Sequence, residues 1–238
     1  MLGCAEFCLP GKNLKERLEA ARKHNLWVEL VNNGKRDLSI LSSFDTEIKS
    51  VQAYLLHDLS LLSKNAAIRK AALRHVKDTI EIAGKIEAGN VLTVPTYGFE
   101  YVAWPYKKCI EIFRELSNFA LDFDVRILIE ALSRKRTSLL PSLAETRGLV
   151  KAINRKNVCL MADTCHIYDS GENVAKMLKK FSSEIVELHL RDSESLPPGK
   201  GKLNFKKILR ICKNSLLCLE YKSGSEKDLE DSLKYLKN

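Results

Sequence analysis

The sequence predicts a (β/α)8 TIM barrel, an α/β fold in which eight parallel strands alternate with eight helices. Short apolar runs alternate with longer amphipathic segments along the whole chain. The length of 238 residues is close to the roughly 250 residues of a typical barrel. No linker, change of composition or low-complexity stretch divides the chain. We therefore expect a single barrel domain over residues 1–238.

The expected strands are five or six residues long and rich in apolar side chains. Turn-forming or polar residues lie between these runs and the segments that follow. The strands are expected at Gly3 to Cys8, Leu26 to Val31, Val51 to Leu56, Asn90 to Val94, Val125 to Glu130, Asn157 to Ala162, Ile185 to Leu190 and Leu216 to Glu220.

The expected helices lie between these strands and show helical spacing of apolar residues. Pro141 suits the first turn of the fifth helix, and Asn204 is placed to cap the seventh. The stretch SILSSFDTEIKS in the second helix also fits a loop. The helices are expected at Leu14 to His24, Asp37 to Ile48, Asn65 to Ala88, Tyr106 to Leu121, Leu140 to Asn154, Glu172 to Phe181, Phe205 to Cys212 and Ser225 to Leu236.

Four polar residues stand at the ends of successive apolar runs: Glu130, Asp163, His189 and Glu220. They are 33, 26 and 31 residues apart, which is about one strand, loop and helix each. A parallel barrel brings such residues to its C-terminal rim. Their oxygen and nitrogen atoms suit one divalent ion, Mn²⁺, Mg²⁺, Co²⁺ or Zn²⁺. Each residue alone also fits a helix cap or a salt bridge.

Five further residues are candidates for contact with a substrate at this rim. His57 is expected to end the third strand, and His166 lies three residues after the metal aspartate. Arg191 is placed to bind a substrate hydroxyl or phosphate, or to pair with a neighbouring carboxylate. Trp104 and Tyr97 lie in the loop after the fourth strand, where they would wall the pocket or pack on the barrel.

The chain is basic, with 39 Lys and Arg against 30 Asp and Glu, a net charge of +9. This charge suits nucleic acid or a phosphorylated substrate. It equally suits a solvated, lysine-rich surface, because no block of five like charges occurs.

The composition excludes several other classes of protein. No apolar stretch approaches the roughly 18 residues of a membrane-spanning helix. The first residues, MLGCAEFCLPGKN, lack the pattern of a secretory signal. Seven scattered cysteines without a CxxC pair indicate neither a disulfide framework nor a zinc ribbon. We therefore expect a cytoplasmic protein that does not enter a membrane.

The second half of the chain resembles a known superfamily. The stretches IEAL, NVCLMADTCH, VELHLRDSESLPPGKGKLNF and CLEY resemble the xylose-isomerase-like barrels, which are sugar isomerases and epimerases and include abasic-site nucleases of the endonuclease IV type. The resemblance implies that Glu130, Asp163, His189 and Glu220 hold the metal. It also implies that the two glutamates are the acid/base pair and that His166 contacts the substrate.

This resemblance predicts a metal-dependent isomerase or epimerase of a small sugar or keto-polyol. Removal of a proton next to a ketone needs a base near neutral pH and a Lewis acid that stabilises the enediolate. Two carboxylates on opposite faces of the carbon would take the proton and return it. The net charge leaves a phosphorylated sugar open, and the sequence predicts no oligomeric state.

The sequence leaves three alternatives open. An abasic-site nuclease would act on DNA, but it needs further histidines where this chain reads LTVPTYG and SESLPPGKGKLN. An inosose-type polyol dehydratase uses the same metal and the same proton abstraction, so motifs do not separate it. A non-catalytic barrel that only binds a ligand is the third.

Overall fold

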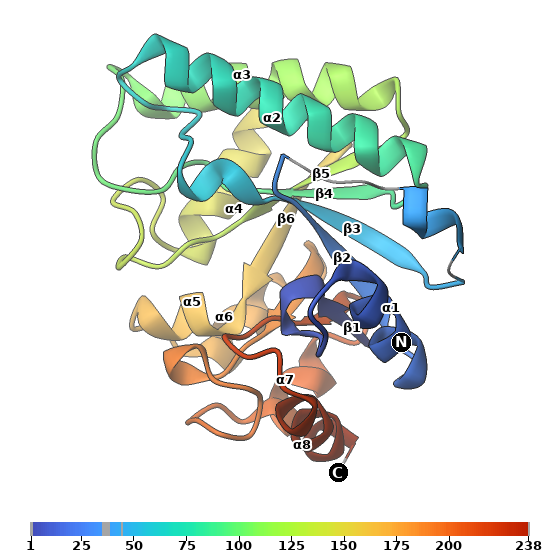
Figure 1. Cartoon of the computed structure of the whole chain (residues 1–238). Coiled ribbons are helices and arrows are strands. Elements are labelled where there is room, and N and C mark those ends of the chain that lie inside the picture. Colours follow the sequence, from blue (N-terminus) through green and yellow to red (C-terminus); the bar gives the residue numbers. More distant parts are fainter. Residues whose placement is uncertain (1, 35–38, 44, 238) are drawn as a thin grey trace.

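The computed structural model describes residues 2–34, 39–43 and 45–237 and contains a closed parallel barrel (Figure 1). Each strand pairs with the next, and β1 pairs with β8 to close the ring. The predicted (β/α)8 fold is confirmed. The strands are β1 (Leu2–Ala5), β2 (Trp27–Asn32), β3 (Ile48–Ala53), β4 (Asn90–Thr93), β5 (Arg126–Glu130), β6 (Val158–Asp163), β7 (Ile185–Leu190) and β8 (Leu216–Leu219).

Helices surround the barrel, with α2 and α3 on one side of it and α7 and α8 on the opposite side in Figure 1. The α-helices of the described residues are α1 (Leu14–Lys23), α2 (Ala66–Lys85), α3 (Pro105–Leu121), α4 (Leu143–Ile153), α5 (Thr164–Asp169), α6 (Val174–Phe181), α7 (Phe205–Ile211) and α8 (Glu226–Lys237). Short 3₁₀ helices lie at Glu6–Cys8, Ser39–Ser43, Tyr54–His57 and Ser193–Ser195.

The predicted cap of Asn204 is confirmed, whereas Pro141 lies before the N-cap of α4 rather than in its first turn. The Asn204 side chain accepts a hydrogen bond from the Lys207 amide at 3.1 Å. Ser142, directly after Pro141, caps α4 by accepting from the Glu145 amide. These caps satisfy amide groups that have no partner inside the helix.

The second βα unit differs from its prediction. Among the described residues, the β2–β3 connection contains only the 3₁₀ helix Ser39–Ser43, and Ile48 already belongs to β3. Asp37, the predicted helix start, lies outside the described residues. The third strand also ends earlier than expected, because Tyr54–His57 turns into a 3₁₀ helix. The apolar run YLL reads like a strand, although only Leu56 of its side chains is buried.

Apolar side chains fill the space between strands and helices in two large clusters. One lies around β1 and β6–β8, and the other lies around β3–β5 with α2 and α3. A small third cluster, Leu92, Leu128 and Met161, lies inside the barrel. None of the helices in the described ranges is both long and apolar enough to cross a membrane.

Candidate metal centre and pocket

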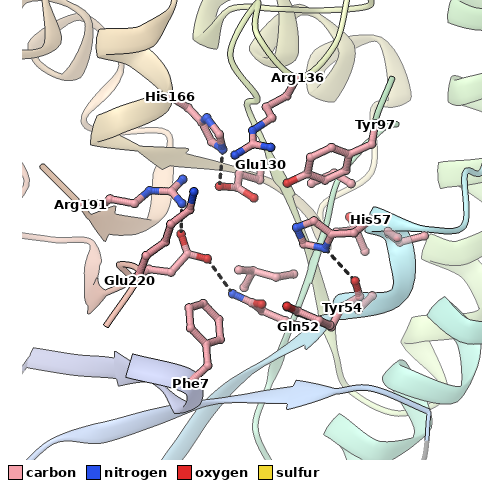
Figure 2. A pocket seen from close by; sticks show the side chains of 16 residues that line it. Phe7, Gln52, Tyr54, His57, Tyr97, Glu130, Arg136, His166, Arg191 and Glu220 are labelled. Carbon is pink, nitrogen blue, oxygen red and sulfur yellow. Dashed lines mark hydrogen bonds and ion pairs between the residues drawn. The ribbon is translucent and has the colours of Figure 1, made fainter. Parts of the chain in front are cut away.

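A pocket of about 320 Å³ opens at the C-terminal ends of the strands (Figure 2). This volume falls at the lower end of the range for small-molecule sites. Its wall contains Glu130 at the end of β5 and Glu220 directly after β8, with His166 and Arg191 beside them. The C-terminal rim is where barrel enzymes place their active sites.

The structure brings the four predicted ligands together. Glu130, Asp163, His189 and Glu220 each offer an atom such that all four atoms lie within 4.8 Å of one another. Asp163 on β6 and His189 on β7 are direct register partners. Asp163 and His189 are fully buried, and the two glutamates are less than 10% exposed.

The donor set fits a divalent cation. Asp163 Oδ2, His189 Nδ1 and Glu220 Oε2 are buried and make no well-aligned hydrogen bond, although Arg191 forms ion pairs with both carboxylate oxygens. Buried polar atoms normally have hydrogen-bond partners, so these atoms have lone pairs that a cation could use. Three carboxylates with one imidazole match Mn²⁺, Co²⁺, Zn²⁺ or Mg²⁺, and the adjoining pocket leaves room for substrate oxygens.

Glu29, a residue that was not predicted from the sequence, fixes the orientation of His189. Its Nε2 lies 3.0 Å from Glu29 Oε2 on β2, while its Nδ1 faces the cluster, 3.3 Å from Glu220 Oε2. Burial lowers the pKa of His189, but without an ion Glu29 and Glu220 overcome this effect and raise that pKa well above its usual range. Metal binding would displace the proton from Nδ1, while the proton on Nε2 stays donated to Glu29. Carboxylate partners of this kind commonly orient metal-binding histidines.

A layer of buried polar residues continues beneath the cluster. The Gln52 amide donates to Glu29 Oε1 at 2.6 Å and to Glu220 Oε1 at 3.2 Å. Ser50 donates to Glu187 at 2.5 Å, across the barrel from β3 to β7. The sequence does mark these buried acids, because each is a glutamate inside an apolar strand, in LWVELV and IVELHL. Such residues are almost never buried without a partner.

The carboxyl groups of the cluster differ in protonation before an ion binds. Burial, aided by the charge of Glu220, raises the pKa of Glu130 to about 8. Burial also raises the pKa of Asp163 to about 6, against the effect of Arg191. Burial opposes ionisation of Glu220 too, but Arg191 and His189 outweigh it and hold the pKa of Glu220 well below its usual range. Near neutral pH and without an ion, the cluster therefore contains both a protonated and an ionised glutamate.

Arg191 and His166 lie beside the cluster, as the sequence predicts. Arg191 Nη2 lies 2.6 Å from Asp163 Oδ2, and its Nη1 lies 3.2 Å from Glu220 Oε2. The guanidinium thus bridges two candidate ligands. Of the two roles predicted for Arg191, the structure contains the pairing with a carboxylate. His166 Nε2 lies 3.9 Å from Glu130 Oε1. The Asp163 side chain caps α5 through the His166 amide at 2.9 Å, which turns His166 toward the pocket.

The remaining candidates separate into two groups. His57 and Tyr97 line the pocket with ring centroids 4.5 Å apart. His57 comes from the 3₁₀ helix after β3 rather than from the strand end, which corrects its predicted element. Trp104 does not line the pocket and is 82% exposed. It precedes Pro105 in a left-handed conformation, which places it at the N-terminus of α3. The expectation that Trp104 walls the pocket is therefore wrong for this structure.

Replacing Glu29 with Gln is expected to weaken binding of Mn²⁺ by about 10- to 100-fold, because the amide is a poorer acceptor for His189 Nε2–H. Calorimetric titration of the folded variant measures the change. Glu187→Gln is the matched control, because Glu187 Oε1 is 3.9 Å from His189 Nε2, beyond hydrogen-bond distance. Equal affinities of wild type and Glu29→Gln would contradict this role.

The sequence profile of the xylose isomerase-like TIM barrel family matches residues 7–238. The chain belongs to this family. Family membership agrees with the resemblance found in the strand-end motifs.

Two curated relatives illustrate the breadth of the family. An uncharacterised protein of Methanocaldococcus jannaschii is 28% identical over 95% of this chain and 93% of its own length. An inosose isomerase of Halalkalibacterium halodurans is 25% identical over 63% of this chain. The match spans 58% of that isomerase.

Solved structures share the barrel over nearly their whole length. The 3-keto-D-glucoside 4-epimerase of E. coli superimposes with a TM-score of 0.85 at 16% identity, covering 99% of this chain and 98% of that one. The IolI protein, with a bound zinc atom, gives 0.80 at 19% identity, covering 99% and 95%. At these identities the likeness shows the fold.

Proposed function

We propose that the chain is a metal-dependent isomerase or epimerase that acts on a small sugar or keto-polyol. The observation that carries this proposal is the placement of two glutamates, Glu130 and Glu220, in one candidate metal cluster at the floor of a pocket. The family and the isomerase activity of a named relative support the same reaction class.

The two glutamates are suited to acid/base work because their environments differ. Without a bound ion, Glu130 holds its proton near neutral pH, whereas Glu220 is ionised. Two titratable groups whose pKa values are pushed apart commonly form an acid/base pair. They come from strands β5 and β8, which are not neighbours in the barrel. A substrate carbon held between them would present one face to each carboxyl group.

A bound divalent ion would supply Lewis acidity toward the carbonyl and hydroxyl oxygens of the substrate. One carboxylate then takes the carbon-bound proton, and the C–H electrons form the enediolate. The other carboxyl group returns a proton to the opposite face in an epimerase, or a proton is returned at the neighbouring carbon in an isomerase. His166, beside Glu130, is placed to bind a substrate oxygen, and His57 and Tyr97 wall the pocket.

The nuclease alternative finds little support in the pocket. Among the described residues, the only histidines that line the pocket or belong to its candidate metal cluster are His57, His166 and His189. His24 lines a separate pocket with Leu2, at the start of β1. His75 accepts a hydrogen bond from the Leu55 amide. The histidines and carboxylates at the pocket therefore suffice for one metal position rather than three.

The proposal is tested by incubating the metal-loaded protein with ketopentoses, ketohexoses and inosose in deuterated water. We expect deuterium at the carbon next to the carbonyl of at least one compound, together with an isomer or epimer as product. Abasic DNA serves as the opposing substrate, and we expect no incision above a control with the metal alone. Incision of DNA without hydrogen exchange on any sugar would replace the proposal with the nuclease.

A further inference from the structure

The pocket carries more positive charge than its carboxylates balance. Both lining carboxylates, Glu130 and Glu220, belong to the candidate metal cluster, and Arg191 is paired with Asp163 and Glu220. Arg136 and Lys222 also line the pocket. Within the described ranges, neither side chain has an ion pair or a hydrogen bond.

The backbone holds Arg136 in place. The Ser133 carbonyl accepts from the Arg136 amide at 2.8 Å and from the Thr137 amide at 3.2 Å. The Gly98 amide donates to the Arg136 carbonyl at 2.8 Å, and Tyr101 Oη lies 2.9 Å from Thr137 Oγ1. The loop after β5 is thereby tied to the loop after β4, so the base of the Arg136 side chain is fixed.

The guanidinium of Arg136 faces the interior of the pocket. Figure 2 shows it reaching in between His166 and Tyr97, toward Glu130. Arg136 therefore shares the space into which a substrate would project.

Lys222 is held at the same pocket from a different part of the chain. It follows Glu220 by two residues, and its amide donates to the Ser195 carbonyl at 3.2 Å. Ser195 belongs to the loop after β7, which the Asp192 carboxylate fixes by accepting hydrogen bonds from four backbone amides, those of Ser193, Gly199, Gly201 and Leu203. Two anchored loops thus carry the two cations that have no partner.

We infer that the substrate carries an anionic group, a phosphate or a carboxylate, that Arg136 and Lys222 bind while the reacting carbons lie at the metal cluster. This inference rests on the proposed function, because it names the substrate class of the same pocket. A guanidinium binds either oxyanion through two parallel hydrogen bonds, and an ammonium adds a point charge. Unpaired cations in a concave site also raise the local concentration of anions.

The test compares sugars that differ only in the group at carbon 6, which is neutral or anionic. Two series are used: D-fructose, D-fructose 6-phosphate and D-fructuronate, and the same three forms of D-tagatose. Calorimetry measures their binding to the metal-loaded protein, and solvent hydrogen exchange is followed in the same samples. We expect a charged form to bind at least about tenfold more tightly than the neutral one. The phosphate and uronate arms show which oxyanion is preferred.

Substitutions test whether Arg136 and Lys222 cause the preference for a charged sugar. Arg136→Met and Lys222→Met should each weaken binding of the charged sugar by about 10- to 100-fold while neutral sugars bind as before. Arg134→Met is the matched control, because Arg134 lies in the same loop and is exposed outside the pocket wall. It should leave every affinity unchanged.

The two readouts separate this inference from the proposed function. Anion preference that depends on Arg136 and Lys222, without hydrogen exchange on any sugar, would support the anion site and reject the isomerase. The anion site is overturned if neutral sugars bind as tightly as charged ones, if no charged sugar binds, or if the preference persists in the double Met variant.

Discussion

Replacing Glu130 or Glu220 with Gln is expected to lower turnover by at least about 10², as for loss of a positioned general acid or base. Gln preserves side-chain volume and one ligand oxygen but neither takes nor gives the proton. The two variants should differ in hydrogen exchange. The variant that lacks the abstracting base should lose exchange, whereas the variant that lacks the returning acid should keep exchange while losing product.

A matched control separates proton transfer from metal binding, because both glutamates are also candidate ligands. Asp163→Asn removes the charge of a third ligand and leaves both glutamates in place. Enough metal is added to each variant for turnover to be compared at equal metal occupancy. Each variant is first checked for its folded circular dichroism spectrum. Near-normal turnover of both Gln variants on a confirmed substrate would leave Glu130 and Glu220 as metal ligands only.

The sequence predicted the barrel because its physical signals are local and repeated. Eight apolar runs with intervening amphipathic segments leave few other folds for this length. The failures lie where local signals conflict. The run YLL after β3 is apolar enough for a strand but forms a 3₁₀ helix. The α5 helix was missed because it has only 6 residues and its start depends on the cap that Asp163 supplies.

Only part of the candidate site could be predicted from the sequence. Residues at strand ends in a parallel barrel meet at one rim, so the cluster of Glu130, Asp163, His189 and Glu220 followed from topology. The contact between His189 and Glu29 could not be predicted in this way, because sequence alone does not show which strand positions face each other across the barrel. Loop residues were also ambiguous. Trp104 and Arg136 both follow strands, but backbone conformation decides which of them enters the pocket.

Replacing Asp163 or His189 with Ala is expected to abolish stoichiometric metal binding, since each change removes one of four protein ligands. Wild type should bind about one divalent ion per chain, as measured by mass spectrometry after dialysis. His189 is shared with a second buried group, Glu29, Glu187 and Cys218. Asp163→Ala tests the rim cluster alone, whereas Cys218→Ala tests the inner group and should leave occupancy unchanged.

The acidic surface group of His24, Glu226 and Glu230 gives a further control, because Glu226→Gln should not alter the metal content. The pH dependence supplies a second readout of the rim cluster. Metal binding requires ionised carboxylates, and the pKa values of Asp163 and Glu130 are raised to about 6 and about 8. Affinity should therefore rise as pH increases through this interval, with release of protons on binding. Unchanged occupancy in both Asp163→Ala and His189→Ala, or an affinity that is flat over this pH interval, would contradict the assignment of the metal to these four residues.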